Sequence, residues 1–593
     1  MILDDKVVVL FRVVVYPKAT IVFYKNTENG KEVHCTFSDD IIDRDRLRAI
    51  HVSKKSQSVL FVGYSCHEFD CHVINYLIDS YDIARPSDIY YFAKQEINEE
   101  NESLDAKKHF YSLDMKLIYQ SEKLRLSFDQ LCTSLNEDYF FMESNENFDI
   151  TKVIEHSCMG AMEKLLNIIE PKIRLRLDLY YDHRVNAMNV DDVLMGIRYM
   201  TKAYLDKTKE DRQKFISGRT SAQLAKLSEI IKYKPQTKPL EAYLAKVGDT
   251  IINPEKTGKE AWNTILNMHN TILSIAQGGV HSITKPSKFV CKDDEVIVKY
   301  DFTSMFPTVM VNLNLFPRHF KAEFAEVYNS IRLERIKAKI EGNKLLNELY
   351  KKVINSAIGL MGSDWSYMYD PLMNSSVRLN AEFITLDLVE LLGEYAKIIQ
   401  VNIDGVFILA KKSDEIMIHN RVSDFMSKAN MPFETEYYSK MFQLSVNDYV
   451  ALDTQETLIR KGAFARKEAP KSFVAPIIAE AAVNNLIYNI PIKQTINSCQ
   501  DWSMFLMTTN VDNRFTVHIG NTLLPNHVRY HYNKNAPYLV RKSENSETVI
   551  DRESGATVVY EIASICPEMI DKSAYSRCAN KITSQFLQEE LFA

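Results

Sequence analysis

The stretch VNIDGVFI, residues 401–408, places one carboxylate, Asp404, inside an apolar run that is otherwise typical of a buried β-strand. Burying a lone charge is costly, so such an aspartate usually has a partner, often a metal ion or a hydrogen-bond network. Asp-Gly is also a strong two-residue hairpin signal, so Asp404 could equally be a turn residue. This stretch alone favours the turn, and the rest of the chain decides between the two interpretations.

The composition is that of a globular protein with several domains. The chain has 593 residues, of which 46% are hydrophobic and 25% charged, so a large core is expected and long disordered stretches are not. Its nine cysteines are dispersed, which argues against a disulfide framework and favours a reducing compartment. The N-terminus has acids where a signal peptide needs basic residues, and no apolar run reaches about 18 residues. We therefore expect an intracellular protein with no membrane partner.

The charge pattern leaves nucleic-acid binding open. A net charge of −6 is not the global signature of a nucleic-acid binder, but phosphates respond to the local field. Residues 331–352 and 459–471 are locally basic. A solvated helix face would explain either basic window. Both windows matter because they lie near the candidate site at Asp404, one on each side in the sequence.

The first half of the chain is predicted to change from strand-rich to helical structure. Apolar runs separated by turn signals predict mixed α/β structure over residues 1–100, and helical spacing predicts helices over 100–250. Lysines and prolines over residues 232–246 indicate a linker. Residues 256–277 are expected to form a helix that ends at Gly278–Gly279.

A second aspartate gives Asp404 a candidate partner. EVIVKYDFTSMFP, residues 295–307, predicts a strand with Asp301 at its end, followed by a turn or a short helix. Aspartates on adjacent strands of one antiparallel sheet can reach the same pair of divalent cations. Two such cations about 3.5–4 Å apart can activate a 3′-hydroxyl and stabilise a leaving pyrophosphate. Carboxylates suit Mg²⁺.

A basic helical hairpin is expected between the two aspartates in sequence. Residues 324–341 and 343–358 predict two helices, broken at Gly342–Asn343. Lys351 and Asn355 are four positions apart and share one helix face, as do Arg335 and Lys339 on the preceding helix. A cationic hairpin facing two carboxylates is what phosphoryl transfer to a nucleotide requires, because positioning and charge neutralisation supply most of the catalysis.

An ordered series of short motifs over residues 270–470 resembles family B DNA polymerases of the phage type. DFTSMFP, with Asp301, Ser304, Phe306 and Pro307, resembles motif A, KKVINSAIG resembles motif B, and NIDG resembles the phage form of motif C. AQGGVHS resembles the segment between the exonuclease and polymerase modules, and VNDYV followed by RKGAF resembles a later palm segment. Each motif is weak alone, but their order is specific and favours Asp404 as a catalytic residue.

The resemblance implies a role for each matching residue. Asp301 and Asp404 would bind two Mg²⁺ ions, for which Mn²⁺ can substitute, with the Phe302 carbonyl completing one shell. Phe306 stands where the family keeps a tyrosine that excludes a ribose 2′-hydroxyl, and Ile358 replaces the motif B tyrosine beside the nascent pair. The implied nucleotide-binding residues are Ser304, Phe306, Arg335, Lys339, Lys351, Asn355 and Gly359. The implied DNA-binding residues are Gly278, Gly279, His281, Tyr449 and Lys461. Past residue 470, basic residues alternate with tyrosines, which suggests that Arg529 and Lys534 follow a duplex backbone, and an ordinary amphipathic surface is the equal alternative.

The N-terminal region resembles the 3′–5′ exonuclease domain of these enzymes with part of its acids replaced. Arg12 and Val14 stand at the two acid positions of the first motif, while Asp70 and Asp192 remain in the second and third. Proofreading needs two metals held by about four carboxylates, so we predict none.

The heptapeptide CHEFDCH, residues 66–72, offers two cysteines, two histidines and an aspartate as metal ligands. A zinc site is not expected there, because no second ligand pair follows and neighbours on one strand or helix would point apart.

The resemblance implies an α+β right-hand polymerase of palm, fingers and thumb, preceded by an RNase H-like exonuclease-type domain. The expected divisions are an inactive exonuclease-like domain 1–215, a helical linker 216–270, palm 271–325 and 362–470, fingers 326–361 and thumb 471–593. The implied activity is that of an exonuclease-deficient nucleotidyltransferase that extends a DNA primer–template with dNTPs.

This enzyme would act in the cytoplasm of a bacterial host, encoded by a virus or mobile element. A processivity factor, helicase or primase is its expected partner. The alternatives are a catalytically silent primer–template scaffold and a lesion-bypass or repair polymerase.

Overall fold

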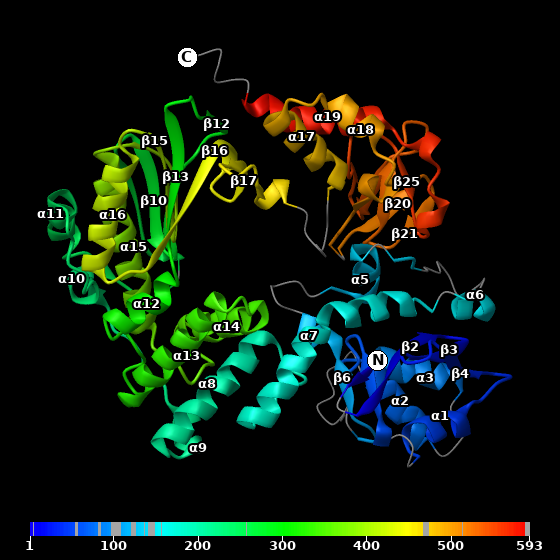
Figure 1. The fold of residues 1–593 in the computed structure, drawn as a ribbon. Coiled ribbons are helices and arrows are strands. Elements are labelled where there is room, and N and C mark those ends of the chain that lie inside the picture. The colour runs from blue at the N-terminus through cyan, green and yellow to red at the C-terminus, as the bar shows by residue number, and fades with distance from the viewer. Residues whose placement is uncertain are drawn as a thin grey trace. The chain divides into compact units, whose positions relative to one another are not determined.

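The computed structural model has a mixed α+β fold that divides into two compact units (Figure 1). The first comprises residues 1–195, 466–478 and 496–578, and the second comprises residues 196–465, 479–495 and 579–593. No helix in the described part of the chain is both long and apolar enough to cross a membrane. The structure describes all residues except 4, 54–56, 81–84, 97–107, 120–125, 136, 140–148, 156, 257, 466–473, 513 and 587–593.

The first unit begins with a mixed sheet in the order β4-β3-β2-β5-β6, with β1 beside β2. Strands β2, β3 and β4 are antiparallel, whereas β5 is parallel to β2 and β6 is parallel to β5. The strands are β1 (Ile2–Leu3), β2 (Lys6–Tyr16), β3 (Ala19–Asn26), β4 (Glu32–Ser38), β5 (Val59–Gly63) and β6 (Ser112–Asp114). The helices are α1 (Arg44–His51), α2 (Asp70–Asp79), α3 (Pro86–Tyr91), α4 (Met115–Tyr119), α5 (Phe128–Ser134), α6 (Ile150–Glu155) and α7 (Met159–His183).

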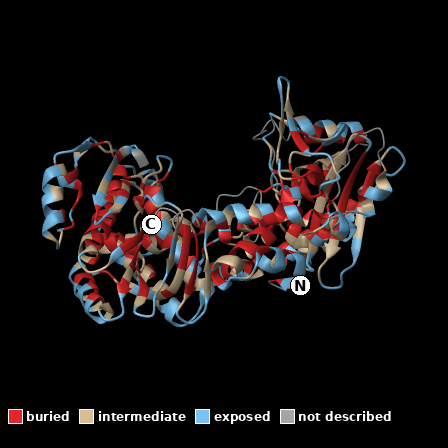
Figure 2. Ribbon diagram, turned by 90° about the horizontal axis from the view of Figure 1, so that it is seen from above, coloured by how far each residue is buried: buried red, intermediate tan, exposed pale blue. Residues whose placement is uncertain are grey.

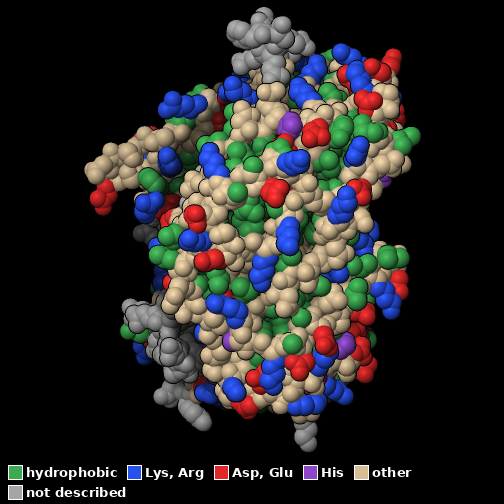
Figure 3. Space-filling model, turned by 90° about the vertical axis from the view of Figure 1, so that its left-hand side faces the viewer, with side chains coloured by type: hydrophobic (Ala, Val, Ile, Leu, Met, Phe, Trp, Pro, Cys, Tyr) green, Lys and Arg blue, Asp and Glu red, His purple; other side chains and the backbone are tan. Residues whose placement is uncertain are grey.

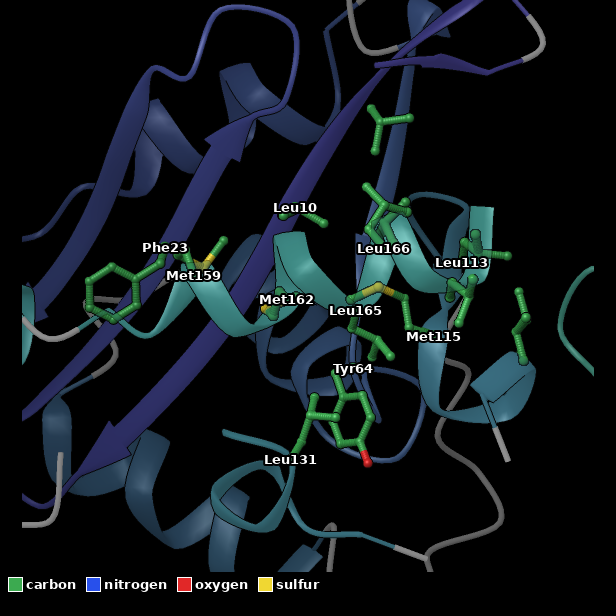
Figure 4. Packing of buried hydrophobic residues seen from close by; sticks show 14 of the residues in the cluster. Leu10, Phe23, Tyr64, Leu113, Met115, Leu131, Met159, Met162, Leu165 and Leu166 are labelled. Atoms are coloured by element: carbon green, nitrogen blue, oxygen red, sulfur yellow. The ribbon is translucent and has the colours of Figure 1, made fainter. Parts of the chain in front are cut away.

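Both faces of this sheet are covered, because alternate residues of β2 enter two different cores. Val8 and Leu10 belong to the cluster formed with α7, whereas Phe11 and Val13 belong to the cluster formed with α2 and α3. Figure 4 shows side chains of α7 packing on the sheet and on Tyr64. They are Met159, Met162, Leu165 and Leu166, which share one helix face.

The C-terminal part of the first unit consists of two small antiparallel sheets that pack with N-terminal residues. Thr133 on α5 is hydrogen-bonded to His527 Nε2 at 2.8 Å, and Asp138 accepts the Ile562 N–H at 2.8 Å. Residues 496–578 therefore share a unit with residues 1–195, which differs from the single thumb expected over 471–593. The strands are β19 (Met507–Thr508), β20 (Thr516–Ile519), β21 (Thr522–Leu524), β22 (Arg529–Tyr532), β23 (Leu539–Ser543), β24 (Ser546–Val549) and β25 (Ala556–Val558), and one helix is α19 (Lys572–Thr583).

The second unit is built on a seven-stranded antiparallel sheet in the order β14-β15-β13-β16-β17-β18, with β12 beside β16. Helix α15 (Pro371–Gly393) is apolar and buried along most of its length, because it contacts the sheet on one side and α16 (Glu415–Ala429) on another. The buried residues, red in Figure 2, follow the sheets and the helices packed on them. The strands are β12 (Ser287–Val290), β13 (Glu295–Phe302), β14 (Lys397–Asn402), β15 (Gly405–Lys411), β16 (Phe433–Ser445), β17 (Asp448–Asp453) and β18 (Leu458–Arg460).

The second unit contains further strands and helices besides this sheet. On the face shown in Figure 3, basic and acidic side chains are interspersed, in keeping with the small net charge. The strands are β7 (Ala225–Lys226), β8 (Ile251–Ile252), β9 (Gly258–Met268), β10 (Thr271–Gln277) and β11 (Gly279–Ser282). The helices are α8 (Asp192–Thr208, which begins in the first unit), α9 (Arg212–Ser217), α10 (Leu227–Ile230), α11 (Lys238–Val247), α12 (Met305–Asn312), α13 (Glu323–Ile340), α14 (Lys344–Met361) and α17 (Pro476–Tyr488). Helix α17 begins in residues 466–478, which belong to the first unit. Helix α18 (Ile492–Ser498) ends in residues 496–578, which also belong to the first unit.

The helix expected over residues 256–277 is wrong: β9 and β10 form a hairpin there. Burial alternates along β9, with Trp262 and Met268 buried and Ile265 exposed, which is a strand pattern. His269 and Asn270 form the two-residue turn, and both have positive φ, as such tight hairpin turns require.

The linker expected over residues 232–246 is also wrong, because this segment is fastened to α15. Asp387, which is fully buried, accepts hydrogen bonds from the Tyr233 hydroxyl at 2.7 Å and the Thr237 N–H at 3.1 Å. Helix α11 then begins at Lys238. By contrast, the helical hairpin predicted over residues 324–358 is confirmed as α13 and α14, with Asn343 capping α14 by accepting the Leu346 N–H.

Candidate active site

Two aspartates lie next to each other at one end of the seven-stranded sheet. Asp301, near the end of β13, is paired with Gly405, the first residue of β15. Asp404 is the second residue of the two-residue turn that joins β14 to β15, directly before Gly405. The Asp404 carbonyl accepts the Phe302 N–H at 2.7 Å. The two interpretations of Asp404 therefore combine: it is an exposed turn residue, and the turn carries it beside Asp301.

Glycine at position 405 leaves space for the Asp301 side chain and is not needed there for an unusual backbone conformation. The turn residues are Ile403 and Asp404, and Gly405 is not among the residues with positive φ. A Cβ atom at position 405 would lie 2.8 Å from Asp301 Oδ1, closer than real Cβ contacts come. The Asp-Gly pair thus matters here because the glycine leaves room for a carboxylate on the neighbouring strand.

Lys299 and Glu436 complete a charged cluster around Asp301. The Lys299 ammonium lies 2.9 Å from Asp301 Oδ1 and 3.5 Å from Glu436 Oε2. Burial raises the pKa of the Asp301 carboxyl, Lys299 opposes this rise, and the Asp404 and Glu436 carboxylates add to it. Neither Lys299 nor Glu436 was predicted. The available signal was strand alternation, because side chains two residues apart share a strand face. Lys299 thus shares a face with Asp301 on β13, and Glu436 shares one with Glu434 on β16.

The helical hairpin contacts this end of the sheet through two of its predicted cations. The Arg335 guanidinium donates to the Ser304 hydroxyl, and Lys339 forms an ion pair with Glu434, the residue paired with Asp301 on β16. Ser304 lies directly before α12 with φ +52°, in the left-handed region. Arg335 and Lys339, predicted to bind the nucleotide, thus contact residues at the same end of the sheet as Asp301.

The outer face of α14 carries the other predicted nucleotide-binding residues. Lys351, Asn355 and Gly359 are exposed at four-residue intervals and form one stripe. Ile358, in contrast, is buried, and its carbonyl accepts a hydrogen bond from Asn374. The side chain of Ile358 is therefore not part of the exposed stripe, whereas its match to the motif B tyrosine implied a place beside the nascent base pair. Phe306 is half-buried on α12.

The Gly278–Gly279 segment lies against the turn that holds Asp404. A Cβ at position 279 would lie 2.3 Å from Ile403 Cγ1, so glycine permits the close approach. The Gly278 N–H donates to Glu382 Oε1 at 3.0 Å, and burial raises the pKa of Glu382 to about 8. Glu382 was not predicted, and the sequence does not single it out, because α15 also contains Asp387 and Glu390.

His281 lies beside the same turn, on β11. Burial lowers its pKa, while a hydrogen bond with Asn402 and the charge of Asp404 oppose that effect. All three residues predicted from AQGGVHS are thus neighbours of the motif C turn.

Tyr449 and Lys461 are joined through the backbone, since the Lys461 N–H donates to the Tyr449 carbonyl at 2.8 Å. Lys461 is exposed. Tyr449 is only 6% exposed, and its ring packs edge-on against Phe407. Burial raises the pKa of Tyr449 and Lys299 opposes this, which places the Tyr449 hydroxyl near the charged cluster, not on an open DNA-facing surface.

Arg529 is a structural residue of the first unit, so its predicted contact with DNA is wrong. Its side chain is fully buried and donates to the carbonyls of Glu137 at 3.1 Å, Val559 at 3.2 Å and Tyr560 at 2.8 Å. Lys534, in the loop after β22, is exposed.

Asp70 and Asp192, the two acids that match the exonuclease motifs in sequence, are held by separate partners. Asp70 is buried and accepts the Val13 N–H at 2.7 Å, and burial raises its pKa to about 7. Asp192 is paired with the fully buried Arg176 at 2.7 Å and with Lys172 at 3.4 Å.

Arg12 and Val14, which stand at the acid positions of the first exonuclease-like motif, are both partly buried. The Arg12 guanidinium lies 4.0 Å from the centroid of the Phe128 ring and donates to the Ser157 carbonyl at 3.2 Å. Val14 packs against the apolar cluster that includes α7. A further buried acid, Asp114, was not predicted, and it accepts N–H groups from Ser65 and His67.

The sequence matches no family model and no curated protein. Among solved structures, the chain is similar to the family B DNA polymerase from the hyperthermophilic archaeon Pyrobaculum calidifontis, with a TM-score of 0.40 and 14% identity. The match covers 97% of this chain and 77% of that chain. A TM-score of this size carries no argument about activity.

Proposed function

We propose that the chain is a template-directed DNA polymerase of the phage-type family B kind, which extends a primer 3′-hydroxyl with dNTPs and does not proofread. The observation that carries the proposal is the position of Asp301 and Asp404, which lie side by side at the end of an antiparallel sheet. The basic helices α13 and α14 contact that same end through Arg335 and Lys339.

The donor set at this end fits two hard divalent cations. Asp301, Asp404 and the main-chain carbonyl of Phe302 offer oxygen ligands, which Mg²⁺ prefers and Mn²⁺ accepts. Two bound ions of this kind would activate the primer hydroxyl and stabilise the leaving pyrophosphate. Besides burial, the Asp404 and Glu436 carboxylates raise the pKa of Asp301, because like charges repel one another. The same negative charge favours binding of a cation between these carboxylates.

The remaining residues would position the nucleotide and the primer. The exposed stripe of Lys351, Asn355 and Gly359 offers a cation, an amide and an open surface on one helix face. Arg335 and Lys339 would bind the triphosphate, since both contact residues at the end of the sheet that carries the two aspartates. Lys461 is exposed and suited to a primer phosphate.

In this proposal the seven-stranded sheet is the palm and α13–α14 are the fingers. The order β4-β3-β2-β5-β6 of the N-terminal sheet suits an RNase H-like domain. Absence of proofreading is supported by the pairing of Asp192 with Arg176 and by the raised pKa of the buried Asp70. Ile358, which stands at the motif B tyrosine position, is buried and so gives no support to the alternative of a lesion-bypass polymerase.

The test is extension of a 5′-labelled primer on a DNA template with Mg²⁺ and dNTPs. Asp404→Asn should abolish extension, whereas Asp424→Asn, at an exposed ion pair on α16, should extend like the parent protein. Lanes without dNTPs should show no primer shortening. Equal extension by the parent and Asp404→Asn would exclude the proposed site, and DNA binding without extension by either would identify a scaffold. Shortening that persists in Asp404→Asn would reveal an active exonuclease.

A further inference from the structure

The turn between β5 and α2 brings three metal-binding side chains together, against the expectation that they would diverge. The ligand atoms of Cys66, His67 and Cys71 all lie within 4.8 Å of one another. In the described part of the chain this is the only such group of three or more His, Cys, Asp or Glu residues. They converge because residues 64–69 form turns, not a strand or a helix, and Cys71 follows in the first turn of α2.

A serine hydroxyl occupies the fourth corner of this group. Ser112 Oγ, at the start of β6, lies 2.9 Å from His67 Nε2, 3.3 Å from Cys71 Sγ and 3.9 Å from Cys66 Sγ. Zinc bonds of about 2.3 Å to sulfur and about 2.0–2.1 Å to nitrogen place tetrahedral ligands about 3.3–3.8 Å apart. The three distances from Ser112 Oγ are close to what such an ion needs, and the other three ligand atoms lie within 4.8 Å of one another.

The chain holds this turn in place by its own backbone contacts. Gly63 permits the approach of Cys66, because a Cβ at position 63 would lie 2.5 Å from Cys66 Cβ. Ser65 has φ +58°, and the Asp114 carboxylate accepts the N–H groups of Ser65 at 2.8 Å and His67 at 3.2 Å. Strained positive φ values of this kind persist only where surrounding contacts enforce them. The ligand cluster is therefore preorganised.

Burial at the cluster suits a soft, closed metal site. Cys66 and Cys71 are fully buried, and His67 is the partly exposed ligand at the edge.

We propose that Cys66, His67 and Cys71 bind a Zn²⁺ ion, with the Ser112 hydroxyl or a water held by it as the fourth ligand. Thiolate and imidazole ligands select Zn²⁺ over Mg²⁺. The ion would tie the turn and the start of α2 to β6 and so stabilise the first unit, independently of any chemistry at Asp301 and Asp404. Binding requires both thiols to lose their protons.

The first experiment measures metal content and replaces zinc with Co²⁺ in the full chain. We expect one Zn²⁺ per chain by elemental analysis after purification without chelator. Co²⁺ added to the chelated protein should give thiolate-to-cobalt charge-transfer bands and the visible bands of a tetrahedral site. Absence of these bands would overturn the proposal, as would complete loss of the metal on simple dialysis.

The variants separate metal binding from packing. His67→Gln and Cys71→Ser should weaken Zn²⁺ binding at least about 10-fold and abolish the rise in melting temperature that Zn²⁺ causes in the parent protein. Cys35→Ser is the matched control, because Cys35 is equally buried in the same apolar core but is not one of the three converging ligands. Equal loss in Cys35→Ser would show that the cluster only packs. A Cys66–Cys71 disulfide in the purified protein, detected by mass after alkylation, would also overturn the proposal.

Discussion

Gly405→Ala isolates the position of Asp301 from the rest of the proposed active site. The new Cβ would lie 2.8 Å from Asp301 Oδ1, which is 0.6 Å inside the 3.4 Å at which ordinary contact begins. The backbone at Gly405 accepts alanine, since its φ is not positive. The strain is relieved most cheaply by rotation of the Asp301 carboxylate away from Lys299, so stability should change by less than about 1 kcal/mol.

Activity should respond far more than stability. A misplacement of about 1 Å at a reacting centre can cost about 100-fold in rate, so a shift of about half that size predicts a loss near 10-fold, equivalent to about 1.4 kcal/mol. Single-turnover primer extension at several Mg²⁺ concentrations, beside urea unfolding of both proteins, measures the two effects. Unchanged turnover at low Mg²⁺ would refute the reasoning. A stability loss above about 2 kcal/mol would show that the strand itself had been disrupted.

Four further substitutions probe single features. Arg529→Met should lower the free energy of unfolding by about 3 kcal/mol or more, because each buried carbonyl left without its donor costs about 1–3 kcal/mol; a change below 1 kcal/mol in urea unfolding would contradict this. Lys534→Met, at an exposed site, should leave the free energy of unfolding within about 0.5 kcal/mol of the parent value. It should reduce the slope of the logarithm of DNA affinity against the logarithm of salt concentration by about 1; an unaltered slope would exclude Lys534 from the DNA interface. Gly359→Ala should stabilise α14 by about 1 kcal/mol, since the added Cβ meets nothing within 4 Å, and should raise the KM for dNTPs; an unchanged KM would mean that the nucleotide binds elsewhere. Glu382→Gln tests the buried carboxyl. The Glu382 carboxyl keeps its proton to about pH 8 in the folded protein and releases it near pH 4.5 in the unfolded chain. As the pH rises from about 4.5 to about 8, the parent protein should therefore lose stability relative to the variant. Parallel pH profiles of unfolding would contradict the raised pKa.

Local patterns were sufficient to locate the two aspartates and the helical hairpin. Apolar runs ending in Asp301 and Asp404 predicted adjacent strands, and the helical spacing with Gly342–Asn343 predicted the break between α13 and α14. Such signals lie within a few residues of one another, so they survive without knowledge of distant partners.

The same kind of pattern misled where a distant partner decides burial. Arg529 lies among basic and aromatic residues, which suggested a DNA-binding surface, but its guanidinium binds the Glu137 carbonyl, 392 positions away in the chain. Residues 256–277 have enough apolar positions for a helix, yet β9 and β10 pair as strands, and the decisive turn at His269–Asn270 has no glycine to signal it.

The sequence by itself determined the order of the motifs, the acids at positions 301 and 404, and the basic character of the hairpin, because these depend on residue type and short-range spacing. Only the tertiary structure decided which charges are paired: Lys299 with Asp301, and Arg176 with Asp192. It also decided that Cys66 and its neighbours converge on Ser112, 46 positions along the chain. These arrangements depend on strand register and turn geometry, which bring distant residues within a few ångströms and which no short stretch of sequence encodes.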